Sequence, residues 1–151
     1  TIYVIMNIAV FSIILSLRKD NSYLQTISEF SGLSKHRPLI ALCLAIIMLS
    51  MAGIPPFAGF FGKFYIFIAA LKADLIFLAV LGVISSVISA FYYLRIIKVM
   101  YFDENEDSNY HFFISSKSLF VLVISMLFIS LFIFYPSLLT SISTNIASDY
   151  F

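Results

Sequence analysis

The chain has 151 residues, of which 62% are hydrophobic and only 11% are charged, and its mean hydropathy is +1.04. A soluble domain usually has about 25% charged residues, so this composition excludes one and predicts an integral membrane protein. The formal net charge of +1 excludes electrostatic capture of nucleic acid as a main activity. The single cysteine, Cys43, excludes an intramolecular disulfide and any metal site built on cysteines.

The first apolar segment covers residues 1–17 and ends at a charged run that starts with Arg18. Its length is near the lower limit for crossing a hydrocarbon core about 30 Å thick, so we expect a transmembrane helix. The chain starts without an initiator methionine or a basic stretch, which is not the layout of a signal peptide and favours a piece of a longer membrane protein. In the polar connection that follows, over 18–38, residues 23–30 are expected to form a short helix on the membrane surface.

The second apolar segment, residues 39–71, is too long for one span, because a continuous helix of that length would measure about 50 Å. Proline lacks a backbone N–H and cannot lie inside an unbroken helix, so the adjacent prolines predict one crossing made of two half-helices with a break at 53–58. A tight hairpin of two short segments is the alternative, but each half is too short to cross alone. The residues expected to make the break are Gly53, Pro55, Pro56, Gly59 and Gly62.

Lys63 follows this break and is the main candidate for function. A charge at membrane depth is costly and by default indicates a functional site, and backbone freed from a helix survives there only inside protein or beside water. A lysine in a low-dielectric site can release its proton near neutral pH, whereas an arginine stays charged, so we expect a proton-channel residue. The alternatives are a lysine that snorkels to the headgroups and a break that is only a packing kink. Snorkelling is disfavoured because Lys72 lies nine residues, about 14 Å of helix, farther on.

Two further helices are predicted, over residues 74–100 and 117–135. Small residues recur at helical spacing in the first of them, which permits close helix contact in a bilayer. The loop between the two helices is acidic but lacks the ordered ligand spacing of a metal site, so no metal is expected. Basic residues set the orientation, because positive loops stay in the cytoplasm or matrix. With four crossings, seven of the nine lysines and arginines fall on that side: Arg18, Lys19, Lys35, Arg37, Arg95, Lys98 and Lys117.

Three tyrosines, Tyr65, Tyr92 and Tyr93, are candidates for a hydrogen-bonded relay towards Lys63. The alternative is that they are interfacial or packing residues. The sequence shows no phosphate-binding loop, paired nucleophile and base, or dinucleotide fingerprint. We therefore expect no self-contained active site and no cofactor bound by this chain.

Two runs, LSMAGIPPFAGFFGKFYIF at 49–67 and FYYLRIIKVMYF at 91–102, resemble the proton-pumping membrane subunits of respiratory complex I. The resemblance implies an all-α bundle of fourteen transmembrane helices with two inverted five-helix repeats, each containing a broken helix. This chain then corresponds to the C-terminal portion, a single membrane domain of four crossings over 1–151. Segment 39–71 matches the second broken helix, and Lys63 matches the family's proton-channel lysine.

The resemblance also implies the setting. The chain would be a non-catalytic subunit of a proton-translocating NADH:quinone oxidoreductase in a bacterial or mitochondrial inner membrane. Its partners would be the lipid bilayer and the other membrane subunits of complex I. Quinone, NADH, FMN and the iron–sulfur clusters would belong to the wider complex. A subunit of a multisubunit cation/proton antiporter and a purely structural membrane anchor are the alternatives.

Overall fold

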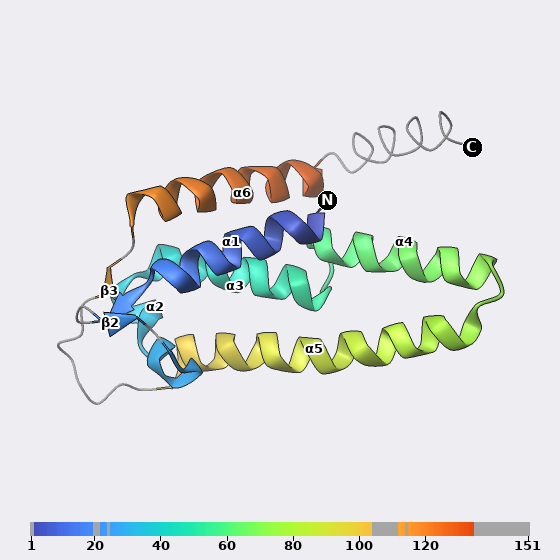
Figure 1. Cartoon of the computed structure of the whole chain (residues 1–151), viewed down its shortest axis with the longest axis horizontal. Coiled ribbons are helices and arrows are strands. Elements are labelled where there is room, and N and C mark those ends of the chain that lie inside the picture. Colours follow the sequence, from blue (N-terminus) through green and yellow to red (C-terminus); the bar gives the residue numbers. More distant parts are fainter. Residues whose placement is uncertain (1, 20–21, 24, 104–111, 114, 135–151) are drawn as a thin grey trace.

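The structure is a computed structural model that describes residues 2–19, 22–23, 25–103, 112–113 and 115–134. These residues form an elongated helical bundle, which confirms the all-α prediction (Figure 1). The helices are α1 (Ile2–Ser16), α2 (Leu33–His36), α3 (Pro38–Ala52), α4 (Ala58–Lys72), α5 (Ile76–Phe102) and α6 (Ser116–Phe134), with a short 3-10 helix η1 (Ile27–Phe30) before α2.

A small antiparallel sheet closes one end of the bundle. Strand β1 (Arg18–Lys19) follows α1 and lies between β2 (Ser22–Tyr23) and β3 (Phe112–Phe113). Its backbone pairing ties the exit of α1 to the segment that leads into α6. The surface helix predicted for 23–30 is shorter than expected, because the chain first forms β2 and only then η1.

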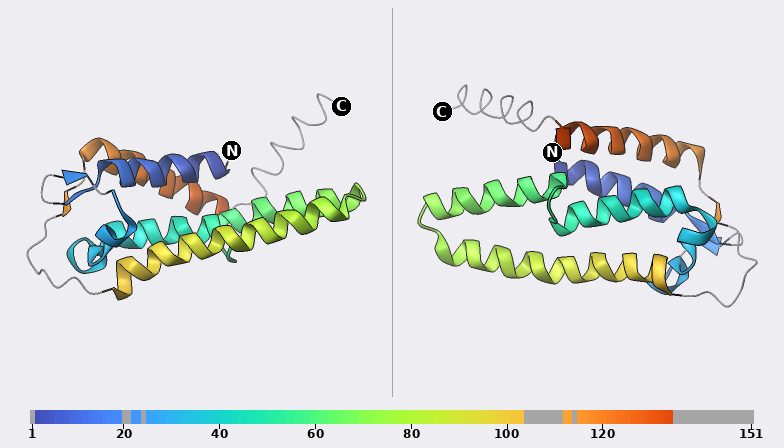
Figure 2. Two further views of the ribbon diagram at one scale, coloured as in Figure 1. Left: turned by 60° about the horizontal axis from the view of Figure 1, so that its bottom comes forward. Right: turned by 180° about the vertical axis from the view of Figure 1, so that it is seen from behind.

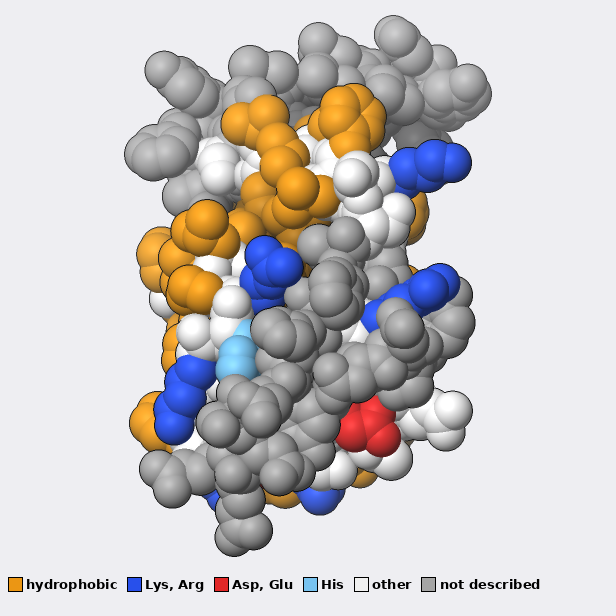
Figure 3. Space-filling model, turned by 90° about the vertical axis from the view of Figure 1, so that its left-hand side faces the viewer, with side chains coloured by type: hydrophobic (Ala, Val, Ile, Leu, Met, Phe, Trp, Pro, Cys, Tyr) orange, Lys and Arg blue, Asp and Glu red, His pale blue; other side chains and the backbone are white. Residues whose placement is uncertain are grey.

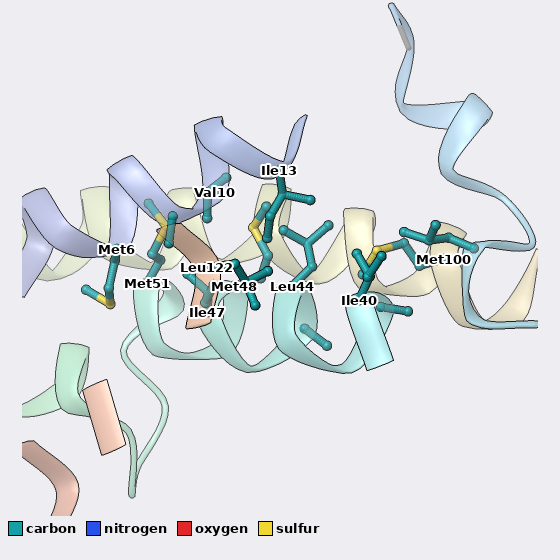
Figure 4. Close-up of a cluster of buried hydrophobic side chains, with 14 of the residues drawn as sticks. Met6, Val10, Ile13, Ile40, Leu44, Ile47, Met48, Met51, Met100 and Leu122 are labelled. Atoms are coloured by element: carbon teal, nitrogen blue, oxygen red, sulfur yellow. The ribbon is translucent and has the colours of Figure 1, made fainter. Parts of the chain in front are cut away.

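Helix α3 is the centre of the apolar core. It is apolar all round and is buried on several sides, because α1, α2 and α5 pack against it. Helix α1 contributes one face, with Met6, Val10 and Ile13 at helical spacing, while Ile8 and Phe11 on its other side are exposed. Figure 4 shows this cluster, which also includes Ile40, Leu44, Ile47, Met48, Met51, Met100 and Leu122.

Among the described helices, α5 is the one that is long and apolar enough to cross a membrane, with 27 residues and a mean hydropathy of 2.1. The apolar windows of α1, α3 and α6 are shorter. Most side chains in the first half of α5 are exposed, as expected for a surface that meets lipid or other helices. Gly82 lets α5 approach α4, because a Cβ there would lie 2.7 Å from Phe67 Cε1. Ser85 and Ser89 instead donate hydrogen bonds to carbonyls of their own helix.

Helices α3 and α4 follow one another along the bundle, and α5 runs back beside both (Figures 1 and 2). Each of α3 and α4 has 15 residues, about 22 Å of helix, so neither alone spans the hydrocarbon core. Since α4 continues in the direction of α3, the tight-hairpin alternative does not fit this arrangement.

The polar segments gather at the end where α1 and α5 finish and α3 and α6 begin (Figure 1). Figure 3 shows lysine, arginine and histidine side chains on this end face. The turn between α4 and α5, with Lys72 beside it, lies at the opposite end. Most of the basic side chains in the described residues therefore lie at one end of the bundle.

This arrangement predicts the topology. In a Cys43→Ala background, a cysteine at Ser34 in α2 should react with a membrane-impermeant maleimide only from the cytoplasm or matrix. A cysteine at Ala73, in the turn after α4, should react only from the outer face, because an odd number of crossings separates the two positions. Labelling of both positions from the same face would contradict a single broken crossing.

Candidate functional site at the helix break

Gly53 caps the carboxyl end of helix α3 in a left-handed conformation, with φ of 85°. The Gly53 N–H donates to the carbonyls of Leu49 and Ser50 at 3.2 and 3.0 Å, and the Ile54 N–H donates back to Leu49 at 3.2 Å. This pattern is a Schellman-type end, which favours glycine because a Cβ is strained at positive φ. The chain therefore leaves α3 with these amide groups already paired inside the protein.

The link to α4 is short and contains the two prolines. Pro55 and Pro56 have no amide hydrogens to satisfy, and the Phe57 N–H donates to the Ile54 carbonyl at 3.1 Å. Phe57 has extended backbone angles and immediately precedes α4. Because the described amides of the link are paired with protein, the break needs no water at these groups.

The first turn of α4 lies directly against the last turn of α3. The Gly59 N–H donates to Ser50 Oγ at 3.0 Å, and Ser50 Oγ donates in turn to Met6 Sδ of α1 at 3.0 Å. Ser50 is fully buried. A Cβ on Gly59 would overlap the Ser50 carbonyl group, so only glycine fits this approach. Three helices thus meet at one hydroxyl.

Lys63 lies one turn after Gly59 and is half-buried. Its Nζ donates to the Ala52 carbonyl, in the last residue of α3, at 3.1 Å. The side-chain stem crosses Gly53, where a Cβ would lie 3.0 Å from Lys63 Cδ. The ammonium group therefore lies at the carboxyl end of α3, where unpaired carbonyls carry a partial negative charge that favours a cation.

This geometry leaves Lys63 with donors to spare. An ammonium group has three N–H donors, and the one hydrogen bond that Lys63 makes among the described residues is to Ala52. A half-buried lysine with two further donors can also contact water. The site can therefore hold a proton at Nζ and present it to a hydrogen-bonded chain, which is the chemistry of a relay rather than of covalent catalysis.

The predicted tyrosines are not gathered around Lys63. Tyr65 and Tyr92 have exposed side chains, and no hydrogen bond joins any of the three tyrosines to Lys63 among the described residues. Tyr93 instead lies 3.3 Å from Tyr3, hydroxyl to hydroxyl, and so links α5 to α1. A relay through these tyrosines remains a prediction that needs intervening water.

Sequence reasoning missed three contributors, Ser50, Met6 and the Ala52 carbonyl. Ser50 offered a signal, since it is the one hydroxyl residue in an otherwise apolar α3. The Ala52 carbonyl offered none beyond the expected break, because any residue supplies a backbone carbonyl. Of the five predicted break residues, Gly53 and Gly59 are held in tight positions, whereas a Cβ on Gly62 would meet nothing within 4 Å.

No group of three or more metal-ligating side chains gathers within the part of the chain that the structure describes. Asp103 is the first acidic residue after α5, and its Oδ1 lies 4.0 Å from Lys98 Nζ. The rest of the acidic loop, from 104 to 111, lies outside the described residues.

The two glycines of α4 provide a matched test of the junction. Gly59→Ala should destabilise the assembled protein by about 1–3 kcal/mol, because the added methyl group forces the two half-helices apart. Gly62→Ala, in the same helix but in open space, should be neutral or slightly stabilising, since alanine is the better helix former. Thermal unfolding of the detergent-purified protein measures both. Equal melting temperatures for the two variants would show that the helices do not touch at Gly59.

A family model described as NADH:quinone oxidoreductase/Mrp antiporter, transmembrane, matches residues 1–89. NADH-quinone oxidoreductase subunit N of Pelagibacter ubique is 46% identical over 149 residues, which cover 97% of this chain and 31% of that protein. The protein of the same name from Parvibaculum lavamentivorans is 55% identical over 103 residues, 68% of this chain and 21% of that relative. The chain therefore spans less than a third of the length of these relatives.

A solved structure has the same fold. A chain in the structure of respiratory complex I from Thermus thermophilus with bound aureothin superimposes with a TM-score of 0.74 at 24% identity. The match covers 91% of this chain and 31% of that one. The likeness to subunit N confirms the resemblance to the membrane subunits of respiratory complex I that was drawn from the residues around the break.

Proposed function

Because the chain belongs to the NADH:quinone oxidoreductase/Mrp antiporter transmembrane family, a family of multi-pass membrane proteins, we propose that it forms part of a proton channel in an inner-membrane NADH–quinone oxidoreductase. It would act as the C-terminal portion of an antiporter-like subunit, with four crossings and Lys63 as the group that takes up and releases the proton. Quinone reduction would occur elsewhere in the complex, so the chain needs no cofactor of its own. Its partners would be the other membrane subunits and the lipid.

The observation that carries the proposal is the position of the Lys63 ammonium group. It donates to the Ala52 carbonyl at the carboxyl end of α3, beside the junction of the two half-helices. A lysine that only snorkels extends its ammonium group to the headgroups, away from the helix break. Lys63 instead points back to the break, where it donates to the Ala52 carbonyl. The partial negative charge of the helix end favours the protonated form there, but a partial charge is weaker than a carboxylate partner would be.

The description of the family covers redox-driven pumps and antiporters alike, so membership does not choose between them. The relative from Pelagibacter ubique, which matches 97% of this chain, favours the redox-linked subunit. A secondary antiporter would transport cations without a quinone-reducing partner, so co-purification with quinone reductase activity separates the two. A purely structural anchor would tolerate replacement of Lys63.

The proposal predicts a specific effect of Lys63 variants in the full complex. Lys63→Met should lower the number of protons pumped per quinone reduced while the complex still assembles, because methionine keeps much of the stem but carries no proton. Lys63→Arg should also impair pumping, since a guanidinium group does not release its proton. Lys63→Glu should retain part of the yield, because a buried carboxyl also titrates near neutral pH. Proton uptake and quinone reduction are measured together in sealed vesicles.

Lys72→Met is the matched control. It makes the same substitution in the same helix, at an exposed residue of the last turn, and should pump with the wild-type yield. Wild-type yield and turnover in Lys63→Met would refute the proposed role of this lysine and leave the anchor as the better description.

A further inference from the structure

We propose that Ser50 is a positioning residue for Lys63. Its hydroxyl sets the register between the two half-helices and thereby holds the Lys63 ammonium group at the carboxyl end of α3. This inference rests on the proposed function of Lys63 and adds a residue to it. Ser50 itself makes no hydrogen bond to the ammonium group or to the Ala52 carbonyl among the described residues.

The Ser50 side chain is paired both as a donor and as an acceptor. The hydroxyl is fully buried and makes two hydrogen bonds, accepting from the Gly59 N–H and donating to Met6 Sδ, both at 3.0 Å. An amide in the first turn of a helix has no partner within that helix. Ser50 therefore supplies to α4, from α3, the capping acceptor that Phe57 does not, since Phe57 makes no side-chain cap.

The backbones of α3 and α4 are in close contact at Ser50 and Gly59. A Cβ on Gly59 would overlap the Ser50 carbonyl group, so the backbones of α3 and α4 are already as close as glycine permits. The hydroxyl limits sliding of one half-helix along the other, because a hydrogen bond weakens steeply once its length and angle depart from the optimum. Close approach and hydrogen bond together specify one register.

The same register sets the position of Lys63. Gly59 and Lys63 are four residues apart in α4 and so lie one above the other on the same face of the helix. Their partners, Ser50 and Ala52, both lie in the last turn of α3. The two contacts form parallel links between the same pair of helix ends. Loss of the Ser50 hydroxyl would leave the Lys63–Ala52 bond, at 3.1 Å, as the remaining hydrogen bond between these two helix ends among the described residues.

The role of Met6 extends the inference to α1. The thioether is a weak acceptor, so its bond to the hydroxyl adds little strength but orients the hydroxyl hydrogen away from Gly59. The oxygen lone pairs are then directed to the Gly59 amide. Helix α1 thus contributes to the placement of Lys63 through the Ser50 hydroxyl.

The test compares Ser50 variants in the full complex, reconstituted in sealed vesicles. Ser50→Ala should lower the proton yield per quinone towards that of Lys63→Met, at unchanged quinone reduction per assembled complex. Ser50→Cys, which replaces the hydroxyl with a somewhat larger thiol that accepts hydrogen bonds only weakly, should give an intermediate yield. The control is Ser125→Ala, which removes another buried serine hydroxyl, in α6, and should keep the wild-type yield.

The double variant Ser50→Ala/Lys63→Met distinguishes positioning from general packing. If Ser50 acts through Lys63, the double variant should pump no less than Lys63→Met alone. A further loss in the double variant, or a wild-type yield in Ser50→Ala, would overturn the proposal. If the complex with Ser50→Ala does not assemble, the proton yield of Ser50→Cys tests the proposal. If neither Ser50 variant assembles while Ser125→Ala does, the proposal is wrong and Ser50 serves folding instead.

The result also separates this inference from the proposed function. Wild-type pumping in Lys63→Met would remove the role of the lysine itself, whatever Ser50 does. Impaired pumping in Lys63→Met together with normal pumping in both Ser50 variants would retain the lysine and remove only its positioning by Ser50.

Discussion

The contact between the last turn of α3 and the first turn of α4 is the constraint on which the site depends. Gly59 lies so close to the Ser50 carbonyl that a methyl group on Gly59 would not fit, and the Ser50 hydroxyl accepts a hydrogen bond from the Gly59 N–H. In a bilayer the hydrophobic effect does not drive helices together, so close packing and interhelical hydrogen bonds must do so. The interruption is thus a packed junction rather than an open gap.

Such a junction resolves the conflict between a charge and an apolar surrounding. A helix end normally leaves carbonyls unpaired, which is costly without water, and a buried ammonium group is costly without an acceptor. Placing Lys63 on the Ala52 carbonyl offsets part of both costs with one hydrogen bond. The remaining donors of Lys63 are then the part of the site that can respond to water and to neighbouring charges.

The placement of Lys63 beside a helix break was predictable from the sequence, because it depends on local chemistry. Two adjacent prolines must interrupt a helix, and a lysine just beyond them must find a partner or water. Its actual partner was not predictable, because a backbone carbonyl is available at every residue and only the folding of α4 beside the end of α3 selects Ala52. The tyrosines show the converse, since Tyr93 was noticed from sequence but its partner Tyr3 lies ninety residues away.

The sequence by itself determined that the chain is a membrane protein, that its helices are apolar, that the second apolar segment is broken and which lysine follows the break. These features depend on composition, segment length and proline stereochemistry, which act within a few residues. The tertiary structure decided which faces are buried and which atoms meet. Helices such as α1 and α3 are apolar on every side, so periodicity cannot distinguish the face that packs from the face that meets lipid. Only the packing of α1, α3 and α4 brings Met6 and Gly59 to the Ser50 hydroxyl, because this contact requires three helices at once.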